Sequence, residues 1–398
     1  MSTSEPIIRL AAKGDGVTES CRHIAGGVPG DMVDEAGAIT AGSHHIAPAC
    51  RHFGTCGGCL LQHADDAALA EFVEGRVVNA ARGQGLEPEE LLPVHLSPPQ
   101  TRRRAGLHGL RTAKGAVLGY REGGSHRVVD LAECPVLHPR LSALIAPLRR
   151  FVAAFGPKGM VGIDLTLADQ GVEVGFSQFP LEGLGPTEAA LDFAREHGLA
   201  RLTFDQGYGP ETQWEPEPAT VTLGGVPVSL PPGAFLQATA DAEAIMAADA
   251  AEWLAGARIV ADLFAGLGTF AFALRQGRKV LAVEAERAAH LACKSAGAMT
   301  GGGVLALHRD LFRSPLQPEE LNRFDAVLLD PPRAGARAQV AEIAASTLSR
   351  VVYVSCNPSS WSRDAAVLAE AGFRLVKLRP VGQFRWSTHV ELVSYFER

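Results

Sequence analysis

Apolar residues along this chain follow three patterns. Up to about residue 45, short β-branched runs are broken by glycine, as in PIIRLAAKGDGV and RHIAGGVPGDMV, which is typical of short strands joined by turns. Between residues 94 and 230, short apolar runs alternate with turns and predict an antiparallel sheet in a domain of α+β type. The strands are expected at AVLGYRE, RVVDLAECPVL, GIDLTLAD, GVEVGFSQF, RLTFDQ and ATVTLGGVPVSL. After residue 232, Ala-rich helical stretches alternate with short, fully apolar runs.

That last alternation predicts a doubly wound, mainly parallel sheet with helices on both faces. Its strands are expected at RIVADLF, KVLAVEA, VLALHRD, FDAVLLD, RVVYVSC, FRLVKLRP and HVELVSYFE. Two helices are expected upstream, over residues 60–82 and 138–156, from apolar positions at helical spacing. The predicted fold is α/β, with a small β module at 1–48, a β-rich central domain at 49–232 and a Rossmann-like domain at 233–398. The first of the two helices could pack on the Rossmann-like domain.

Composition is that of an ordinary globular protein. The 398 residues are 46% hydrophobic and 20% charged, and 37 Lys+Arg against 44 Asp+Glu give a net charge of −7. No apolar run approaches the ~18 to 20 residues of a membrane span, and MSTSEPIIRL does not resemble a signal peptide, so we expect a cytoplasmic protein without a membrane partner. The acidic total limits nucleic-acid contact to local patches. One basic segment holds Arg102, Arg103, Arg104 and Arg111, which suit phosphate contact or, alternatively, a solvated edge strand.

A nucleotide-binding turn is predicted after the first strand of the Rossmann-like domain. VADLFAGLGTF places Gly266 and Gly268 between a strand and a helix N-terminus, where the backbone can approach a ligand closely. Glu284 ends the next strand, 22 residues after Asp262, and could accept hydrogen bonds from ribose hydroxyls. A dinucleotide enzyme is the competing interpretation, but Ala271 stands where a pyrophosphate fingerprint wants a third glycine. S-adenosylmethionine, which carries no phosphate, fits better.

Three more side chains are candidates for chemistry, and the first two are expected at the same edge of the sheet. Asp330 precedes two prolines that fix the exit of the chain from its strand. Cys356 ends a strand on a sharp turn, where a thiolate could attack an electrophile. Glu391 lies between apolar neighbours, and a carboxylate is costly there unless it is paired or used, so it could serve as a general base. A plain strand terminator and a buried structural cysteine are the alternatives for the prolines and for Cys356.

Four of the seven cysteines form a pattern that disulfides explain poorly, because the number is odd and there is no export signal. Cys50, Cys56 and Cys59 share ten residues with three glycines, too tightly for a helix or a strand, and Cys134 follows far downstream. Four thiolates can hold either zinc or an iron–sulfur cluster, since both prefer soft sulfur ligands, and the spacing alone does not choose.

From residue 50 to residue 393 the chain resembles the bacterial S-adenosylmethionine-dependent RNA (uracil-5-)-methyltransferases that carry an iron–sulfur cluster. The resemblance rests on the four cysteines, PPGAFLQ, DLFAGLGTF, Glu284, DPPRAG, SCNPSSWSRD and HVELV, in the family's order. It implies that Cys356 attacks carbon 6 of uracil and that Glu391 removes the proton from carbon 5 after methyl transfer. It also implies a [4Fe-4S] cluster on Cys50, Cys56, Cys59 and Cys134. The implied cofactor contacts are Gln237, Phe264, Gly266, Glu284 and Asp330.

The resemblance extends to the substrate. It implies 5-methyluridine formation in structured RNA, with 23S ribosomal RNA favoured and transfer RNA as the alternative, and no obligate protein partner is evident. Residues 1–48 resemble a reduced form of the small RNA-binding barrel called TRAM. Phe235 is expected either in a uracil pocket or in the core, whereas core packing is favoured for Phe384.

Two other classes of function stay open. A non-catalytic iron–sulfur RNA-binding or assembly factor would need neither Cys356 nor Glu391, and a methyltransferase of exocyclic nitrogens would need no thiolate.

Overall fold

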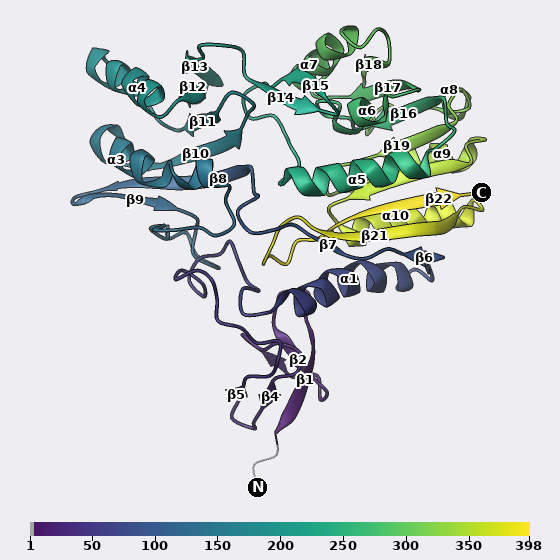
Figure 1. Ribbon diagram of the computed structural model, residues 1–398, viewed down its shortest axis with the longest axis horizontal. Coiled ribbons are helices and arrows are strands. Elements are labelled where there is room, and N and C mark those ends of the chain that lie inside the picture. Colours follow the sequence, from purple (N-terminus) through teal and green to yellow (C-terminus); the bar gives the residue numbers. More distant parts are fainter. Residues whose placement is uncertain (1–3) are drawn as a thin grey trace.

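The computed structural model describes residues 4–398, which form three regions, each built around one main sheet (Figure 1). Residues 1–3, which belong to the predicted N-terminal module, lie outside the described residues. The first region, at the bottom of Figure 1, is a five-stranded sheet in the order β3-β2-β1-β4-β5. Its strands are β1 (Glu5–Leu10), β2 (Gly16–Thr18), β3 (His23–Ile24), β4 (Met32–Val33) and β5 (Ile39–Thr40). The short strands predicted from the glycine-broken pattern are confirmed.

The Cys-rich loop and one long helix follow this sheet. The helix α1 (Asp66–Arg82) begins at its cap Asp65, whose carboxylate accepts a backbone N–H of the first turn at 2.9 Å. The predicted start at Leu60 is wrong. The backbone N–H groups of Leu60 and Leu61 instead donate to the carbonyl of Trp386, which holds this segment outside the helix.

The central region is a six-stranded sheet in the order β13-β12-β11-β10-β8-β9. Its neighbouring strands are antiparallel except for β11 and β12, which run parallel. The strands are β8 (Arg104–Thr112), β9 (Gly115–Gly119), β10 (Met160–Leu167), β11 (Val172–Ser177), β12 (Leu199–Asp205) and β13 (Pro210–Trp214). The hairpin of β14 (Thr220–Leu223) and β15 (Val226–Ser229) follows them. The helices are α2 (Pro139–Ser142), α3 (Ile145–Phe155) and α4 (Leu184–Glu196).

Three local predictions for this region are wrong. The segment 127–137 forms no strand and makes only isolated bridges. The single helix predicted over 138–156 is two helices, because Pro147 lacks the N–H that a continuous helix would donate to Ala143. The pattern of short strands also missed α4, whose crossover allows β11 and β12 to run parallel.

The third region is a nine-stranded sheet in the order β18-β17-β16-β19-β20-β22-β21-β6, with β7 also on β21. Strands β16 to β20 run parallel and β22 lies antiparallel between β20 and β21. The strands are β6 (Glu90–Leu91), β7 (His95–Leu96), β16 (Ile259–Leu263), β17 (Lys279–Glu284), β18 (Val304–His308), β19 (Ala326–Leu329), β20 (Arg350–Ser355), β21 (Arg374–Gly382) and β22 (Glu391–Glu397). The helices are α5 (Ala240–Trp253), α6 (Thr269–Leu274), α7 (Arg287–Ala298), α8 (Pro318–Leu321), α9 (Arg337–Ala345) and α10 (Pro358–Glu370).

This sheet confirms the predicted doubly wound α/β fold. Its central strands are apolar on both faces because helices cover both, and β19 is buried along its whole length. The helix α1 packs against α10 and β21, so it lies beside this sheet (Figure 1). The carboxyl ends of the parallel strands meet at one edge, where ligands bind in such folds. Among residues 4–398, no helix is long and apolar enough to cross a membrane.

Candidate active site

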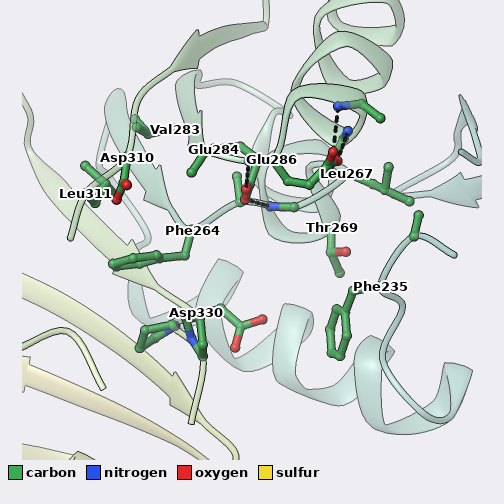
Figure 2. Close-up of a pocket in the computed structure, with 18 of the residues that line it drawn as sticks. Phe235, Phe264, Leu267, Thr269, Val283, Glu284, Glu286, Asp310, Leu311 and Asp330 are labelled. Atoms are coloured by element: carbon green, nitrogen blue, oxygen red, sulfur yellow. Dashed lines mark hydrogen bonds between the residues drawn. The ribbon is translucent and has the colours of Figure 1, made fainter. Parts of the chain in front are cut away.

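A cavity of about 740 Å³ lies at the carboxyl edge of the parallel strands (Figure 2). We call it the sheet-edge cavity. Its walls come from the turns that follow β16, β17, β18 and β19, together with the segment before α5. All five predicted cofactor contacts line it: Gln237, Phe264, Gly266, Glu284 and Asp330.

The turn after β16 is held by Glu284. One carboxylate oxygen accepts the backbone N–H of Gly266 at 2.8 Å, and the other accepts that of Glu286 at 2.6 Å. Phe264 adopts a left-handed φ of 64°, which is uncommon outside glycine, and its ring lies 5.4 Å from that of Phe312. The carboxylate and the strained turn thus form one wall of the cavity, with Phe264 beneath Glu284 in the view of Figure 2.

Gly268 is required by close packing at the start of α6. Its φ is 90°, and a Cβ there would lie 2.7 Å from the Phe272 ring and 2.9 Å from the Cys293 sulfur. Beneath this turn the buried Asp262 accepts the N–H of Ala271 at 2.7 Å. The N–H of Ala271, which stands in place of the third glycine, therefore donates a hydrogen bond to a carboxylate of β16.

Asp330 ends β19 at the floor of the cavity. Burial raises the pKa of Asp330 to about 7, although the side-chain N–H of Gln237, which donates to it at 3.1 Å, lowers that pKa. Burial and the charge of Asp330 also raise the pKa of Asp262 well above its ordinary value. The protein therefore holds carboxyl groups at this edge in surroundings that disfavour their ionised form.

Cys356 and Glu391 lie on neighbouring strands, directly after β20 and at the start of β22. Burial, followed by the charges of Glu391 and Asp330, raises the pKa of the Cys356 thiol to about 11, and Arg333 lowers it. Glu391 is only 4% exposed, and burial together with the charge of Asp330 raises its pKa to about 8. An unusual pKa on two adjacent reactive groups is typical of an active site.

A second cavity, of about 520 Å³, contains the cysteine loop, and we call it the thiol cavity. Cys50, Cys56, Cys59 and Cys134 all line it. Backbone N–H groups two residues downstream approach two of the sulfurs, at 3.4 Å for Cys50 and 3.5 Å for Cys56. Burial, followed by the neighbouring thiols, raises the pKa of Cys59 to about 12, although a hydrogen bond with Gln62 lowers it. The sequence pattern thus brings four thiols to one place.

The composition of this cavity suits soft-metal chemistry, but the described side chains do not form a ready-made ion site. Within residues 4–398, no group of three or more His, Cys, Asp or Glu side chains is arranged to hold a metal ion. The predicted [4Fe-4S] cluster is therefore not shown. The four thiols remain a donor set of the right chemical kind for it.

The two cavities meet at four residues. Phe235, Arg333, Cys356 and Glu391 line both of them. Phe235 is 62% exposed, so the expectation that it could belong to the core is wrong. The Arg104 guanidinium lies over the Phe235 ring, 4.9 Å from its centroid. A flat ring could therefore enter the junction against an aromatic face and reach both the thiol and the carboxylate.

The predicted basic patch does not act as a unit. Arg103 is buried, donates to the carbonyl of Gln237 and forms an ion pair with Glu243. Arg104 donates to a backbone carbonyl, and so does Arg111. Arg102 lies over the ring of Phe384, 5.4 Å from its centroid, and both residues line the thiol cavity. The core assignment of Phe384 is therefore wrong, and Arg102, which also donates to the carbonyl of Arg104, is the member of the patch that lines the thiol cavity.

Sequence reasoning missed four residues of the site. Glu286, Asp310 and Phe312 line the sheet-edge cavity, and Gln383 hydrogen-bonds to Gln237 from the end of β21. Asp310 follows an apolar strand, as Asp330 does, and this position could have identified it. Gln383 is likewise a polar residue directly after an apolar strand, but its partner lies 146 residues away in sequence.

Comparison with known proteins gives three findings. A family model described as tRNA (Uracil-5-)-methyltransferase matches residues 305–398. A protein of Zymomonas mobilis named as an RNA methyltransferase is 48% identical over 98% of this chain and 99% of its own length. The 23S rRNA (uracil(1939)-C(5))-methyltransferase RlmD of Aeromonas hydrophila is 32% identical over 90% of this chain and 84% of its own.

A solved structure has the same fold. The Pyrococcus abyssi tRNA (uracil-54, C5)-methyltransferase, in complex with S-adenosyl-L-homocysteine, superposes with a TM-score of 0.75 over 99% of this chain and 100% of its own, at 21% identity. The two relatives, each more than 30% identical over most of both chains, carry the assignment further than the fold. The chain belongs to the RNA (uracil-5-)-methyltransferase family.

Proposed function

We propose that this enzyme transfers a methyl group from S-adenosylmethionine to carbon 5 of a uridine in structured RNA, with 23S ribosomal RNA as the favoured substrate. The observation that carries the proposal is the junction of the two cavities, where Cys356 and Glu391 lie on adjacent strands and face the same space. A nucleophile and a general base are needed at the same ring for this reaction. The proposal places the enzyme in the cytoplasm.

The residue types account for the chemistry. Carbon 5 of uracil is a weak nucleophile, so the Cys356 thiolate first adds to carbon 6, and the electron pair moves to give an enolate that is nucleophilic at carbon 5. Carbon 5 then takes the methyl group from the sulfonium, which leaves as S-adenosylhomocysteine. Glu391 takes the proton from carbon 5, and the returning electron pair expels the thiolate. Arg333, whose charge lowers the pKa of Cys356, favours the thiolate.

The sheet-edge cavity is the proposed place of the methyl donor. Its lining is largely apolar, which suits the adenine and the methionine chain, and Glu284 at the end of β17 is placed to accept from ribose hydroxyls. The carboxylate already accepts two backbone N–H groups, so its orientation is fixed before a ligand arrives. Each oxygen keeps capacity for a further hydrogen bond.

We extend the proposal to a [4Fe-4S] cluster held by Cys50, Cys56, Cys59 and Cys134. Four thiols around one cavity, with backbone N–H groups aimed at two of the sulfurs, support it. The cluster would fix the loop that forms one wall of the thiol cavity. Anaerobically reconstituted protein should contain about four iron and four sulfide per chain, as a [4Fe-4S] cluster requires. Zinc in place of iron after purification without reconstitution would contradict this part of the proposal.

The experiment that tests the reaction uses unmodified 23S ribosomal RNA and unmodified transfer RNA in separate incubations with S-adenosylmethionine. Mass spectrometry of the nucleosides should find new 5-methyluridine in the ribosomal pool. Product in the transfer-RNA pool alone would reassign the substrate. Cofactor binding without product in either pool would favour the alternative of a non-catalytic RNA-binding or assembly factor, and a methylated exocyclic nitrogen would contradict the thiolate mechanism.

A further inference from the structure

A chain of buried polar side chains connects the proposed base to the floor of the sheet-edge cavity. Gln383, directly after β21, is 2% exposed, and its side-chain amide nitrogen donates to the amide oxygen of Gln237 at 3.0 Å. Gln237, itself 3% exposed, donates to Asp330 at 3.1 Å. Val381 pairs with Glu391 between β21 and β22, so Gln383, two residues further along the same face, comes next to the Glu391 carboxylate, and its amide lowers the pKa of Glu391. Four residues from four segments of the third region therefore share one network.

One backbone group sets the orientation of the whole network. The N–H of Ala238 donates to the side-chain oxygen of Gln383 at 2.9 Å. Because this oxygen faces a donor, the NH2 of Gln383 must face the other way, toward the oxygen of Gln237 and toward Glu391. The NH2 of Gln237 must then face Asp330. The hydrogen bonds leave no freedom to exchange oxygen and nitrogen in either amide.

This polarity matters for Glu391 because a donor facing a carboxylate stabilises its ionised form. The charged and titratable groups around Glu391 are Asp330 at the end of β19, Arg333 after it, Cys356 at the end of β20, and His389 two residues upstream. Asp330 opposes ionisation of Glu391 and Arg333 favours it. Gln383 is the uncharged neighbour that favours ionisation of Glu391.

We propose that Gln383 is a positioning residue that stabilises the ionised form of the Glu391 carboxylate and orients it to accept the carbon-5 proton. The inference rests on the proposed function, since it assigns Gln383 a role in the step that Glu391 performs. A purely structural glutamine would affect stability and leave the proton-removal step alone. The two roles can therefore be separated by experiment.

The test uses RNA that carries tritium at carbon 5 of uridine and a methyl-labelled donor, so that methyl transfer and proton release are followed separately over a pH series. In the Gln383→Met variant, methyl transfer should stay within about twofold of wild type. Proton release should be about tenfold slower at neutral pH, and its rising limb should move up by about one pH unit. The methylated covalent adduct should accumulate. Gln339→Met is the matched control, because Gln339 is a buried glutamine on α9 that bonds both backbone groups of Leu316.

The outcomes separate the inference from the proposed function. If wild type releases no tritium, the proposed function fails. If wild type and Glu391→Gln behave as proposed but Gln383→Met keeps the wild-type pH profile, the inference alone is overturned. If Gln383→Met does not bind S-adenosylmethionine because it misfolds, Gln383→Asn replaces it. That shorter side chain keeps the amide but cannot reach both Ala238 and Glu391, so the same shift is expected, and an unshifted profile overturns the inference.

Discussion

The two cavities that meet at Cys356 are built in different ways. The sheet-edge cavity is formed largely by turns that follow consecutive parallel strands, and its key carboxylate, Glu284, is held by backbone N–H groups close by in sequence. The thiol cavity is assembled from distant segments, namely the loop at 50–62, the irregular stretch around Cys134, and residues 384–389. The order of strands in the sheet therefore determines the sheet-edge cavity, whereas the thiol cavity depends on how separate regions pack against one another.

The difference suits two kinds of ligand. A small cofactor needs one preformed cleft, which any doubly wound sheet can supply at its carboxyl edge. A folded RNA needs a longer surface, and the proposed RNA side is the thiol cavity, which is lined by the cysteine loop, the central region and the C-terminal loop. Chemistry is possible only where both ligands reach the same atoms, which is the junction that contains Cys356 and Glu391.

The largest expected effect comes from removing the nucleophile at this junction. Cys356→Ala should lower the rate of 5-methyluridine formation by at least about a thousandfold, because no other group supplies the addition to carbon 6. Affinity for S-adenosylmethionine should stay within about twofold, since the sheet-edge cavity is otherwise intact. Calorimetry and nucleoside analysis measure the two quantities. Cys21→Ala, at an exposed thiol of the first region, is the control, and normal methylation by Cys356→Ala would rule out the mechanism.

Removing the base should stabilise the fold at high pH. Glu391 has a folded-state pKa of about 8 against an ordinary value of 4.5, so the folded protein binds the proton more tightly than the unfolded chain does. Stability is therefore lost as pH rises between these two values. Glu391→Gln should remove this loss. The free energy of unfolding of the variant minus that of wild type should therefore be roughly 2 to 4 kcal/mol larger at pH 9 than at pH 4. Denaturant unfolding at both pH values measures it, and a pH-independent difference would mean that Glu391 is not held in a costly environment.

The same contrast explains how far sequence reasoning reaches. The parallel strands were predictable because their apolar runs need no partner to be recognised. Asp330 and Cys356 follow from their positions at strand ends, and Glu391 from its place between two apolar residues of a strand. Hydrogen-bond direction in the Gln383 network was not predictable, since it depends on a backbone N–H from a segment far away in sequence.

The arginine patch shows the limit most clearly. Three adjacent arginines look alike in sequence, yet Arg103 is buried and forms an ion pair with Glu243, whereas Arg102 lines the thiol cavity. The partner of Arg103 comes from α5, more than 100 residues away in sequence, so the sequence pattern alone could not identify which arginine is paired with a carboxylate. The helix at 60–82 was likewise predicted from its periodicity, but its start was set by Trp386, more than 300 residues away. Local sequence patterns therefore predict helices and strands, whereas the contacts of individual side chains depend on residues far away in the sequence.

A smaller effect is expected in the sheet-edge cavity, where a change at Glu284 should weaken binding of S-adenosylmethionine. Glu284→Gln keeps the shape of the side chain but gives it an N–H facing two backbone donors, so one of the hydrogen bonds to Gly266 or Glu286 must be lost. The dissociation constant for S-adenosylmethionine should rise about tenfold, corresponding to about 1.4 kcal/mol. RNA affinity without cofactor should be unchanged. Glu286→Gln is a contrast, because Glu286 caps α7 and its change should lower stability by about 1 kcal/mol.

The smallest expected effect concerns the RNA side, where Arg102 and Arg103 can be compared directly. Arg102→Gln should weaken RNA binding about two- to fivefold at physiological salt and reduce the slope of log affinity against log salt by about one, as expected for one lost phosphate contact. Arg103→Gln should leave that slope unchanged and lower stability instead, since it leaves the largely buried Glu243, whose side chain is 14% exposed, without its ion-pair partner. Filter binding over a salt series together with thermal melting distinguishes them. If the slope of log affinity against log salt is the same for Arg102→Gln and wild type, RNA does not contact the wall of the thiol cavity. The proposal that one cavity binds the cofactor and the other binds RNA would then be wrong.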